Sequence, residues 1–254
     1  MRLLLDLGNS AIKWAVVPPG GAAWQTGRLA YADGAGPEDT AAALGGRIPS
    51  TVAPARICVA SVLAPAWQRR FDTALERAWG GPVQHLVASA AAAGVTNGYD
   101  QPEQLGVDRW AALIGARAVA PEGACIVDVG TAITVDGLDA DGRHLGGAIF
   151  PGARLLHQAL ARGTARLPDS PIGAAALPAR STEEGIAAGV AVGAGAAVTA
   201  LADAILAACP PGAQRLITGG GGGELAAGLS PAWCHRPYLV LEGLLHWSRH
   251  EARR

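Results

Sequence analysis

The hydrophobic and polar positions of the chain first follow the pattern of strands and then alternate between strands and helices. Residues 2–7 and 11–17 are apolar runs separated by Gly8-Asn9-Ser10, which predicts two strands joined by a tight turn. Further strands are expected at 23–29, 57–62 and 83–87, and helices near 38–46 and 65–79. This order predicts a mixed sheet with helices on its faces.

The second half of the chain begins the same pattern again. The stretch 124–138 contains an apolar strand, a glycine turn and a second β-branched strand. A third strand is expected at 145–150 and a helix from about 152, followed by a long Ala/Gly-rich helix at 182–207. A strand at 214–218 and an amphipathic helix at 239–250 complete the pattern.

The two halves share an acidic turn. Asp6-Leu7-Gly8-Asn9-Ser10 matches Asp128-Val129-Gly130-Thr131 as Asp-x-Gly followed by a small polar residue, about half the chain length apart. We therefore expect two similar domains, residues 1–118 and 119–254, with their acidic turns directed into a shared cleft. The expectation leaves open whether the last helix packs back on the first domain.

One such turn alone is most simply a hairpin, because Asp, Gly and Asn are common turn residues. Two copies at equivalent strand ends favour phosphate binding, in which glycine lets backbone N–H groups approach the anion. Asp6 would then hold Mg²⁺ directly or through water, and Lys13 would add a positive charge. Thr131 would donate to a phosphate and Asp128 would bind a cation. No P-loop motif is present.

Two glycine-rich stretches carry weaker signals. The sequence GAGAAV at 193–198 lies inside an expected helix, which favours close helix packing over dinucleotide binding. The glycine run at 217–223 follows a strand, and it is either a plain loop or a place where a purine ring lies against the backbone.

The segment 96–113 is the most informative. An irregular polar loop carrying Tyr99 leads into a helix expected near Val107, which places Asp108 and Arg109 at a helix N-terminus. An isolated Asp-Arg pair there is usually an acidic first turn with a solvent-facing arginine. Between two phosphate turns, Asp108 is a candidate proton acceptor, and Arg109 a candidate partner for a carboxylate substrate.

Ser181 or Thr182 is expected to cap the long helix, with Glu184 completing a capping box. Capping by itself explains these residues. The histidines show no convergent pattern and are assigned no chemistry.

Composition excludes several classes of protein. Half of the residues are hydrophobic, 16% are charged and the net charge is −1, so neither nucleic acid nor an anionic membrane is an expected partner. The four cysteines lack metal-site spacing and read as reduced thiols. No signal peptide or membrane-spanning stretch is recognised, so a cytoplasmic location is expected.

These motifs identify the chain as similar to the type III pantothenate kinases. The resemblance rests on the Asp6 turn, Asn97-Gly98-Tyr99, Leu105 through Arg109 and the Asp128 turn, and it spans essentially the whole chain. It also includes GGAIFPG at 146–152, Ser181-Thr182 and Thr218-Gly219-Gly220. The Tyr…Gly-x-Asp-Arg block is specific, whereas a single Asp-x-Gly or Thr-Gly-Gly is not.

The resemblance implies two RNase H-like domains of the actin-like ATPase type, with an interdomain active site. It implies ATP-dependent phosphorylation of pantothenate at the start of coenzyme A synthesis, with Mg²⁺ accompanying ATP. The implied ATP-binding residues are Asp6, Leu7, Gly8, Asn9, Ser10, Ala11, Ile12, Lys13 and Thr131.

The resemblance also implies roles for the acceptor and cation sites. Asp108 would be the catalytic base, and Asp128 would bind a monovalent cation such as K⁺ or NH₄⁺. A homodimer is implied, in which Thr182 reaches the partner's site. The implied pantothenate-binding residues are Tyr99, Gly106, Val107, Asp108, Arg109 and Thr182.

Two alternatives to this function stay open at the level of sequence. One is a kinase of the same fold for another small alcohol or sugar. The other is a non-catalytic regulator that retains the kinase fold, against which the intact Asp6, Asp108 and Asp128 argue.

Overall fold

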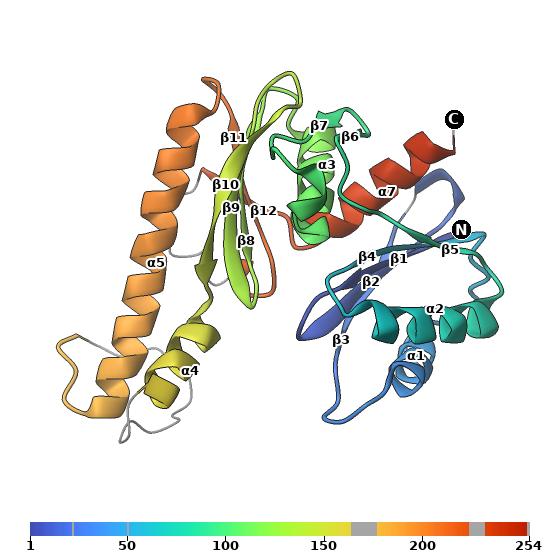
Figure 1. The fold of residues 1–254 in the computed structure, drawn as a ribbon, viewed down its shortest axis with the longest axis horizontal. Helices are drawn as coiled ribbons and strands as arrows, with labels where there is room; N and C mark the ends of the chain where they lie inside the picture. Colours follow the sequence, from blue (N-terminus) through green and yellow to red (C-terminus); the bar gives the residue numbers. More distant parts are fainter. Residues whose placement is uncertain (22, 50, 164–176, 224–231, 253–254) are drawn as a thin grey trace. The chain divides into compact units, whose positions relative to one another are not determined.

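Two units, each built around one five-stranded mixed sheet, make up the computed structural model (Figure 1). The structure describes residues 1–254 except 22, 50, 164–176, 224–231 and 253–254. Unit 1 comprises Met1–Val119 and Tyr238–Arg254, and unit 2 comprises Ala120–Pro237. The mixed sheets and their flanking helices confirm the predicted α/β class.

Unit 1 has the strand order β3-β2-β1-β4-β5. β2 is antiparallel to both β1 and β3, whereas β4 and β5 continue the sheet in parallel with β1. The strands are β1 (Arg2–Leu7), β2 (Ala11–Val17), β3 (Gln25–Ala30), β4 (Arg56–Ser61) and β5 (Val83–His85). The helices are α1 (Pro37–Gly45), α2 (Pro65–Trp79), α3 (Val107–Val119) and α7 (Leu239–Glu251). Short elements are η1 (Pro19–Gly21), β6 (Ala91–Ala92), β7 (Val95–Thr96) and η2 (Pro102–Gln104).

The alternation of side chains along β1 decides where its carboxylate lies. Leu3, Leu5 and Leu7 enter the core formed with Leu44 of α1 and Phe71 of α2. Because successive strand residues point to opposite faces, Asp6 projects from the other face, where α3 and α7 pack.

α3 and α7 approach each other closely because glycine occupies the crossing. A Cβ atom added at Gly243 would collide with the carbonyl of Ala111, and one added at Gly115 would collide with the carbonyl of Leu239. The last helix of the chain therefore belongs to unit 1 and fixes the position of α3.

Unit 2 repeats the strand order of unit 1, as β10-β9-β8-β11-β12. β9 is antiparallel to β8 and β10, and β11 and β12 run parallel to β8. The strands are β8 (Ala124–Val129), β9 (Ala132–Leu138), β10 (His144–Pro151), β11 (Gln214–Thr218) and β12 (Trp233–His235). The described helices are α4 (Ala153–Gly163) and α5 (Thr182–Ala208).

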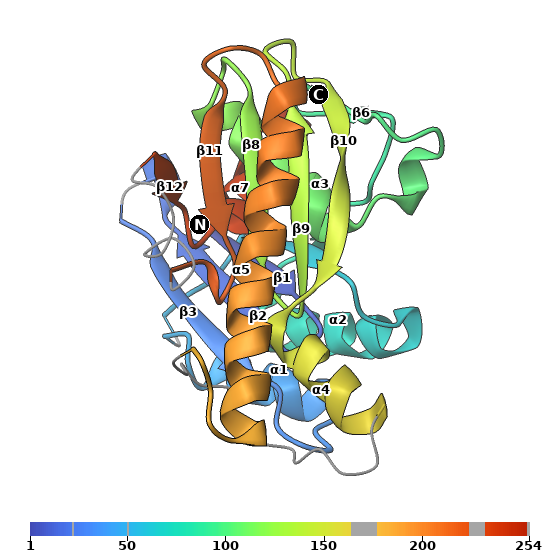
Figure 2. The ribbon, with the colours of Figure 1, turned by 90° about the vertical axis from the view of Figure 1, so that its left-hand side faces the viewer.

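α5 covers one face of the unit 2 sheet (Figure 2). Its Val198 and Ala202 pack against Cys125, Val127 and Ile217 of the strands. Asp128 follows Val127 and therefore projects from the face opposite to α5.

The start of α5 matches the predicted cap in part. The Ser181 hydroxyl accepts a hydrogen bond from the Glu184 amide at 3.2 Å, as a capping box requires. The Glu184 carboxylate accepts from the amide of Arg180, one residue earlier than the motif has it.

The sequence did not predict every element. β12 and the β6–β7 hairpin were missed because each has only two or three residues per strand, too few to show a period. β5 ends at His85, and Val87 is exposed rather than part of the strand.

Candidate active site

The first acidic turn is closed by its own backbone. The Gly8 amide donates to the carbonyl of Ala11 at 3.1 Å, so that Asn9 and Ser10 form the tip. The amide of Tyr31, just beyond β3, donates to the carbonyl of Ser10 at 3.4 Å and links the turn to the third strand.

Asp6 and Lys13 lie directly opposite each other in the β1–β2 pair. Directly opposed residues of an antiparallel pair share a face, with Cβ atoms about 4.5–5.5 Å apart. Both side chains are half-buried. The only lysine of the chain therefore stands beside the carboxylate at the strand end.

The second turn has the same construction but is one residue tighter. The Gly130 amide donates to the carbonyl of Ala132 at 3.0 Å, which leaves Thr131 alone at the tip. Asp128, at the equivalent strand position to Asp6, pairs with Thr134 of β9.

Glycines from two other motifs enclose this second turn. The Gly152 amide donates to the carbonyl of Thr131 at 3.1 Å, and a Cβ there would lie 2.6 Å from the carbonyl oxygen of Gly130. Gly219 has φ +93°, and a Cβ there would lie 2.5 Å from Asp128 Oδ1. The GGAIFPG and Thr-Gly-Gly motifs thus lack side chains where other residues would enter the space around Asp128 and Thr131.

Asp108 lies in the first turn of α3, where the helix dipole favours a negative charge. Its Oδ1 accepts from the amide of Arg109 at 2.8 Å. Gly106 leaves room for this carboxylate, since a Cβ there would lie 2.7 Å from Asp108 Oδ1. The Gly-x-Asp-Arg spacing therefore fixes how Asp108 is held.

Arg109 is 5% exposed rather than solvent-facing, which excludes the simpler interpretation of the Asp-Arg pair. Its Nη1 donates to the Tyr99 hydroxyl at 2.7 Å, and its guanidinium carbon lies 5.5 Å from the centre of the tyrosine ring. The Tyr99 amide in turn donates to Asn97 Oδ1 at 3.0 Å. Asn97 is buried, and its amide group donates to the carbonyls of Ser89 and Pro102.

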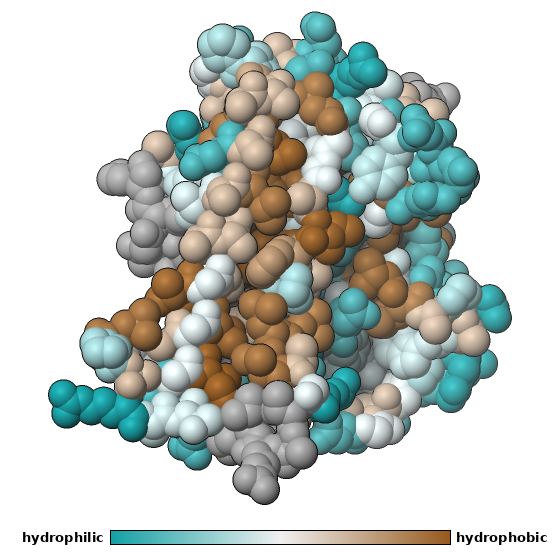
Figure 3. All heavy atoms as spheres, turned by 60° about the vertical axis from the view of Figure 1, so that its left-hand side comes forward, coloured by the Kyte–Doolittle hydropathy of each residue, from teal (hydrophilic) through white to brown (hydrophobic). Residues whose placement is uncertain are grey.

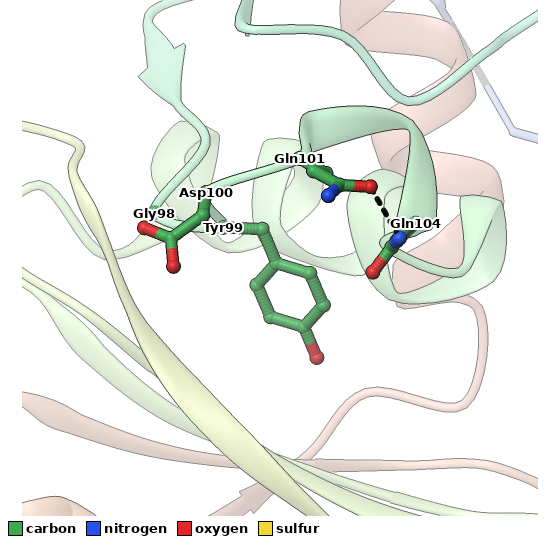
Figure 4. Close-up of a pocket in the computed structure, with 5 residues that line it drawn as sticks. All are labelled: Gly98, Tyr99, Asp100, Gln101 and Gln104. Carbon is green, nitrogen blue, oxygen red and sulfur yellow. Dashed lines mark hydrogen bonds between the residues drawn. The ribbon is translucent and has the colours of Figure 1, made fainter.

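The loop that carries Tyr99 borders a cavity of about 350 Å³ (Figure 4). Tyr99 projects from the loop, with Asp100 on one side of it and the hydrogen-bonded pair Gln101 and Gln104 on the other. The cavity lining is polar and is contributed entirely by unit 1. The sequence shows Asn97 as part of the motif but indicates no role for it, whereas the structure shows that it fixes this loop.

The predicted site residues divide between the two units. Unit 1 contains residues 6–13, Tyr99 and 106–109, and the structure brings Tyr99, Asp108 and Arg109 together through hydrogen bonds. Unit 2 contains Asp128 and Thr131 at one turn. Thr182 is the exposed first residue of α5.

The part of the chain that the structure describes holds no group of three or more His, Cys, Asp or Glu side chains placed to share a metal ion. A transition-metal centre is therefore not indicated among these residues. Single carboxylates at strand ends instead suit Mg²⁺ held together with substrate phosphates.

The model of the type III pantothenate kinase family matches residues 2–204. The chain is 42% identical over 249 residues to the type III pantothenate kinase of Alkalilimnicola ehrlichii, covering 97% of each chain. It is 38% identical over 252 residues to that of Aromatoleum aromaticum, covering 99% of each.

Solved structures show the same fold at low identity. The activator of 2-hydroxyisocaproyl-CoA dehydratase from Clostridium difficile, solved with ADPNP, has a TM-score of 0.56 at 15% identity, covering 99% of this chain and 96% of that one. The ethanolamine utilization protein EutJ from Carboxydothermus hydrogenoformans has a TM-score of 0.55 at 13% identity, covering 96% and 89%. The chain shares the fold of these two proteins, and it belongs to the type III pantothenate kinase family.

Proposed function

We propose that this protein transfers the γ-phosphoryl group of ATP to the primary hydroxyl of pantothenate, giving 4′-phosphopantothenate in the first step of coenzyme A biosynthesis. The observation that carries the proposal is the buried Arg109, which is hydrogen-bonded to Tyr99 directly beside Asp108. Family membership supports the same reaction.

The α3 N-terminus is the proposed acceptor site. Arg109 is pre-oriented by Tyr99, so it pays little conformational entropy when it binds the carboxylate of pantothenate. Gly106, Val107 and Thr182 complete the proposed contacts to this substrate.

Asp108 is the proposed general base. One of its oxygens is engaged by the Arg109 amide, which leaves the other to accept the proton of the attacking hydroxyl. Phosphoryl transfer depends mostly on positioning and charge stabilisation, so a base of ordinary strength is sufficient.

The two acidic turns are the proposed phosphate-binding elements. The backbone and side chains of residues 6–13 and Thr131 would donate to phosphate oxygens, and Lys13 would offset their charge. Asp6 suits Mg²⁺, because this ion is usually held by one or two carboxylates plus substrate phosphates. When bound, Mg²⁺ neutralises charge on the transferring group. Contact of adenine with the glycine run at 219–223 stays a prediction.

Asp128 is proposed to bind a monovalent cation, K⁺ or NH₄⁺. The place of Asp128 at the strand end, equivalent to that of Asp6 in unit 1, supports this assignment.

A homodimer is proposed because unit 2 exposes large apolar side chains on α4 and α5. Leu160 of α4 is 40% and Val192 of α5 is 55% exposed, and Figure 3 shows apolar residues gathered along the face that carries α5. A second copy covering this face would bury them and would bring Thr182 to the partner. Light scattering after gel filtration tests this: a monomer at micromolar concentration contradicts it.

Among the described helices, α5 alone is long and apolar enough to cross a membrane, and 22% of its apolar window is buried. A single such helix is weak evidence for a membrane span. We propose a cytoplasmic protein in which the partner subunit covers α5.

The test of function is ADP release with ATP, Mg²⁺ and pantothenate, repeated with K⁺, NH₄⁺ or Na⁺ as the only monovalent cation. A panel of sugars and small alcohols serves as control acceptors. Turnover with pantothenate alone supports the proposal. Preference for another acceptor identifies a different kinase of this fold, and absence of turnover with any acceptor favours a non-catalytic regulator.

A further inference from the structure

The residues beside the two equivalent carboxylates differ between the units. In unit 1, Asp6 pairs with Lys13 on β2 and with Ala60 on β4. In unit 2, Asp128 pairs with Thr134 on β9 and with Thr218 on β11. Across β2, β1 and β4 of unit 1, the paired side chains therefore end in an ammonium, a carboxylate and a methyl group. Across β9, β8 and β11 of unit 2, they end in a hydroxyl, a carboxylate and a hydroxyl group.

Residues in register on neighbouring strands project from the same face of a sheet. Thr134, Asp128 and Thr218 therefore share the face opposite to α5. The positive charge that unit 1 supplies through a lysine is replaced in unit 2 by two neutral oxygen atoms, an arrangement that suits a cation from solution.

The second observation concerns the hydrogen bonding of the Thr218 hydroxyl. Thr218 is fully buried, and its Oγ1 has no hydrogen-bond partner among the described residues. A buried hydroxyl without a partner costs about 1–3 kcal/mol, so such groups usually mark a place for an ion or a water molecule.

The Asp128 carboxylate lies close to the backbone that follows this hydroxyl. The next residue is Gly219, and a Cβ on it would fall 2.5 Å from Asp128 Oδ1 and into contact with the Val129 backbone. The glycine therefore lets the backbone after Thr218 approach the carboxylate closely, which holds the threonine and Asp128 next to each other.

We propose that Thr218 and Thr134 are ligands, together with Asp128, of the monovalent cation, and that their hydroxyl oxygens make the site suit K⁺. This rests on the proposed cation role of Asp128. One carboxylate with neutral oxygens matches an alkali cation, which proteins bind through oxygen atoms that replace its water shell. A single negative charge is a weak ligand set for a tightly held divalent ion.

The experiment measures cation binding without turnover. The purified full chain in chloride-free choline nitrate is titrated with potassium nitrate while its thermal unfolding is followed, and with thallium(I) nitrate while ²⁰⁵Tl NMR reports binding directly. A bound ion stabilises the folded state by RT ln(1 + [K⁺]/Kd), so the rise of Tm with K⁺ concentration gives the dissociation constant. The variants are T218V and T134V, which remove a hydroxyl with little change of shape, and T218S, which keeps it.

We expect each valine variant to raise the half-saturating K⁺ concentration at least about tenfold, by analogy with the loss of supporting groups at other metal sites. T218S should bind like the unchanged protein. Thr26→Val, a strand threonine of unit 1, is the matched control and should leave binding unaltered.

Each outcome separates the two proposals. Valine variants that bind K⁺ and Tl⁺ normally, while Asp128→Asn does not, overturn threonine ligation and leave the Asp128 assignment intact. Normal binding by Asp128→Asn overturns the cation site itself. Should T218V not fold, T134V and T218S decide the question. Pantothenate kinase activity is measured separately and does not enter this comparison.

Discussion

Substitution of Asp108 separates its proposed catalytic role from its structural role. Asp108 Oδ1 accepts from the Arg109 amide at 2.8 Å in the first turn of α3. Asparagine keeps this acceptor and loses only the charge, which interacts with the helix dipole by about 0.3–1 kcal/mol. Alanine loses both the charge and the hydrogen bond, which is worth about another 1 kcal/mol.

The two variants should therefore differ in stability but not in turnover. For a chain of this size each kcal/mol shifts Tm by about 2–4 °C, so Asp108→Ala should melt a few degrees below Asp108→Asn. Removal of a general base lowers kcat by about 10²–10⁴-fold, or about 2.7–5.4 kcal/mol of barrier, and both variants should show this.

The assay combines ADP release at saturating pantothenate with calorimetric binding of an ATP analogue and thermal unfolding. ATP-analogue affinity should stay within about threefold, since the proposed nucleotide contacts lie elsewhere. If Asp108→Asn turns over at near the wild-type rate, the base assignment is wrong. Loss of analogue binding together with activity would show that the substitution acts through the fold instead.

Three further predictions concern the fold. Gly243→Ala should lower the free energy of unfolding in urea by about 1–3 kcal/mol, because the added methyl group collides with the Ala111 carbonyl. The control is Gly45→Ala, whose methyl group meets nothing within 4 Å and should be neutral or stabilising. Equal effects of the two substitutions would contradict close α3–α7 packing. Burial raises the pKa of the Cys58 thiol to about 11, so a thiol reagent at pH 8 should label the exposed Cys234 well before Cys58. Equal labelling rates of the two cysteines would contradict the burial of Cys58. Burial, aided by the charge of Asp6, raises the pKa of the Tyr31 hydroxyl in the folded protein. As pH rises above about 10, the unfolded chain therefore loses the hydroxyl proton before the folded protein does, and the free energy of unfolding should fall. The Tyr31→Phe variant should lose this dependence of stability on pH.

The repeated acidic turns were predictable because they depend on local chemistry. Asp-x-Gly between apolar runs fixes a strand end and a turn without help from distant residues, and the structure places both turns where the repeat predicts. The long helix at 182–208 was equally visible from its composition and its cap.

The surroundings of the turns were not predictable in the same way. The sequence shows Gly152 and Gly219 only as parts of glycine-containing motifs, whereas the fold brings both against the Asp128 turn from segments far away in the chain. The burial of Arg109 also depends on the packing of unit 1, since the isolated sequence favours exposure of a charged side chain.

By itself, the sequence determined the duplication, the positions of the carboxylates and the family to which they belong, because these follow from residue type and spacing along the chain. Only the tertiary structure decided which side chains flank each carboxylate, because strand register joins residues that no local pattern links. Lys13 beside Asp6 and Thr218 beside Asp128 are the result: two copies of one turn with different electrostatic environments.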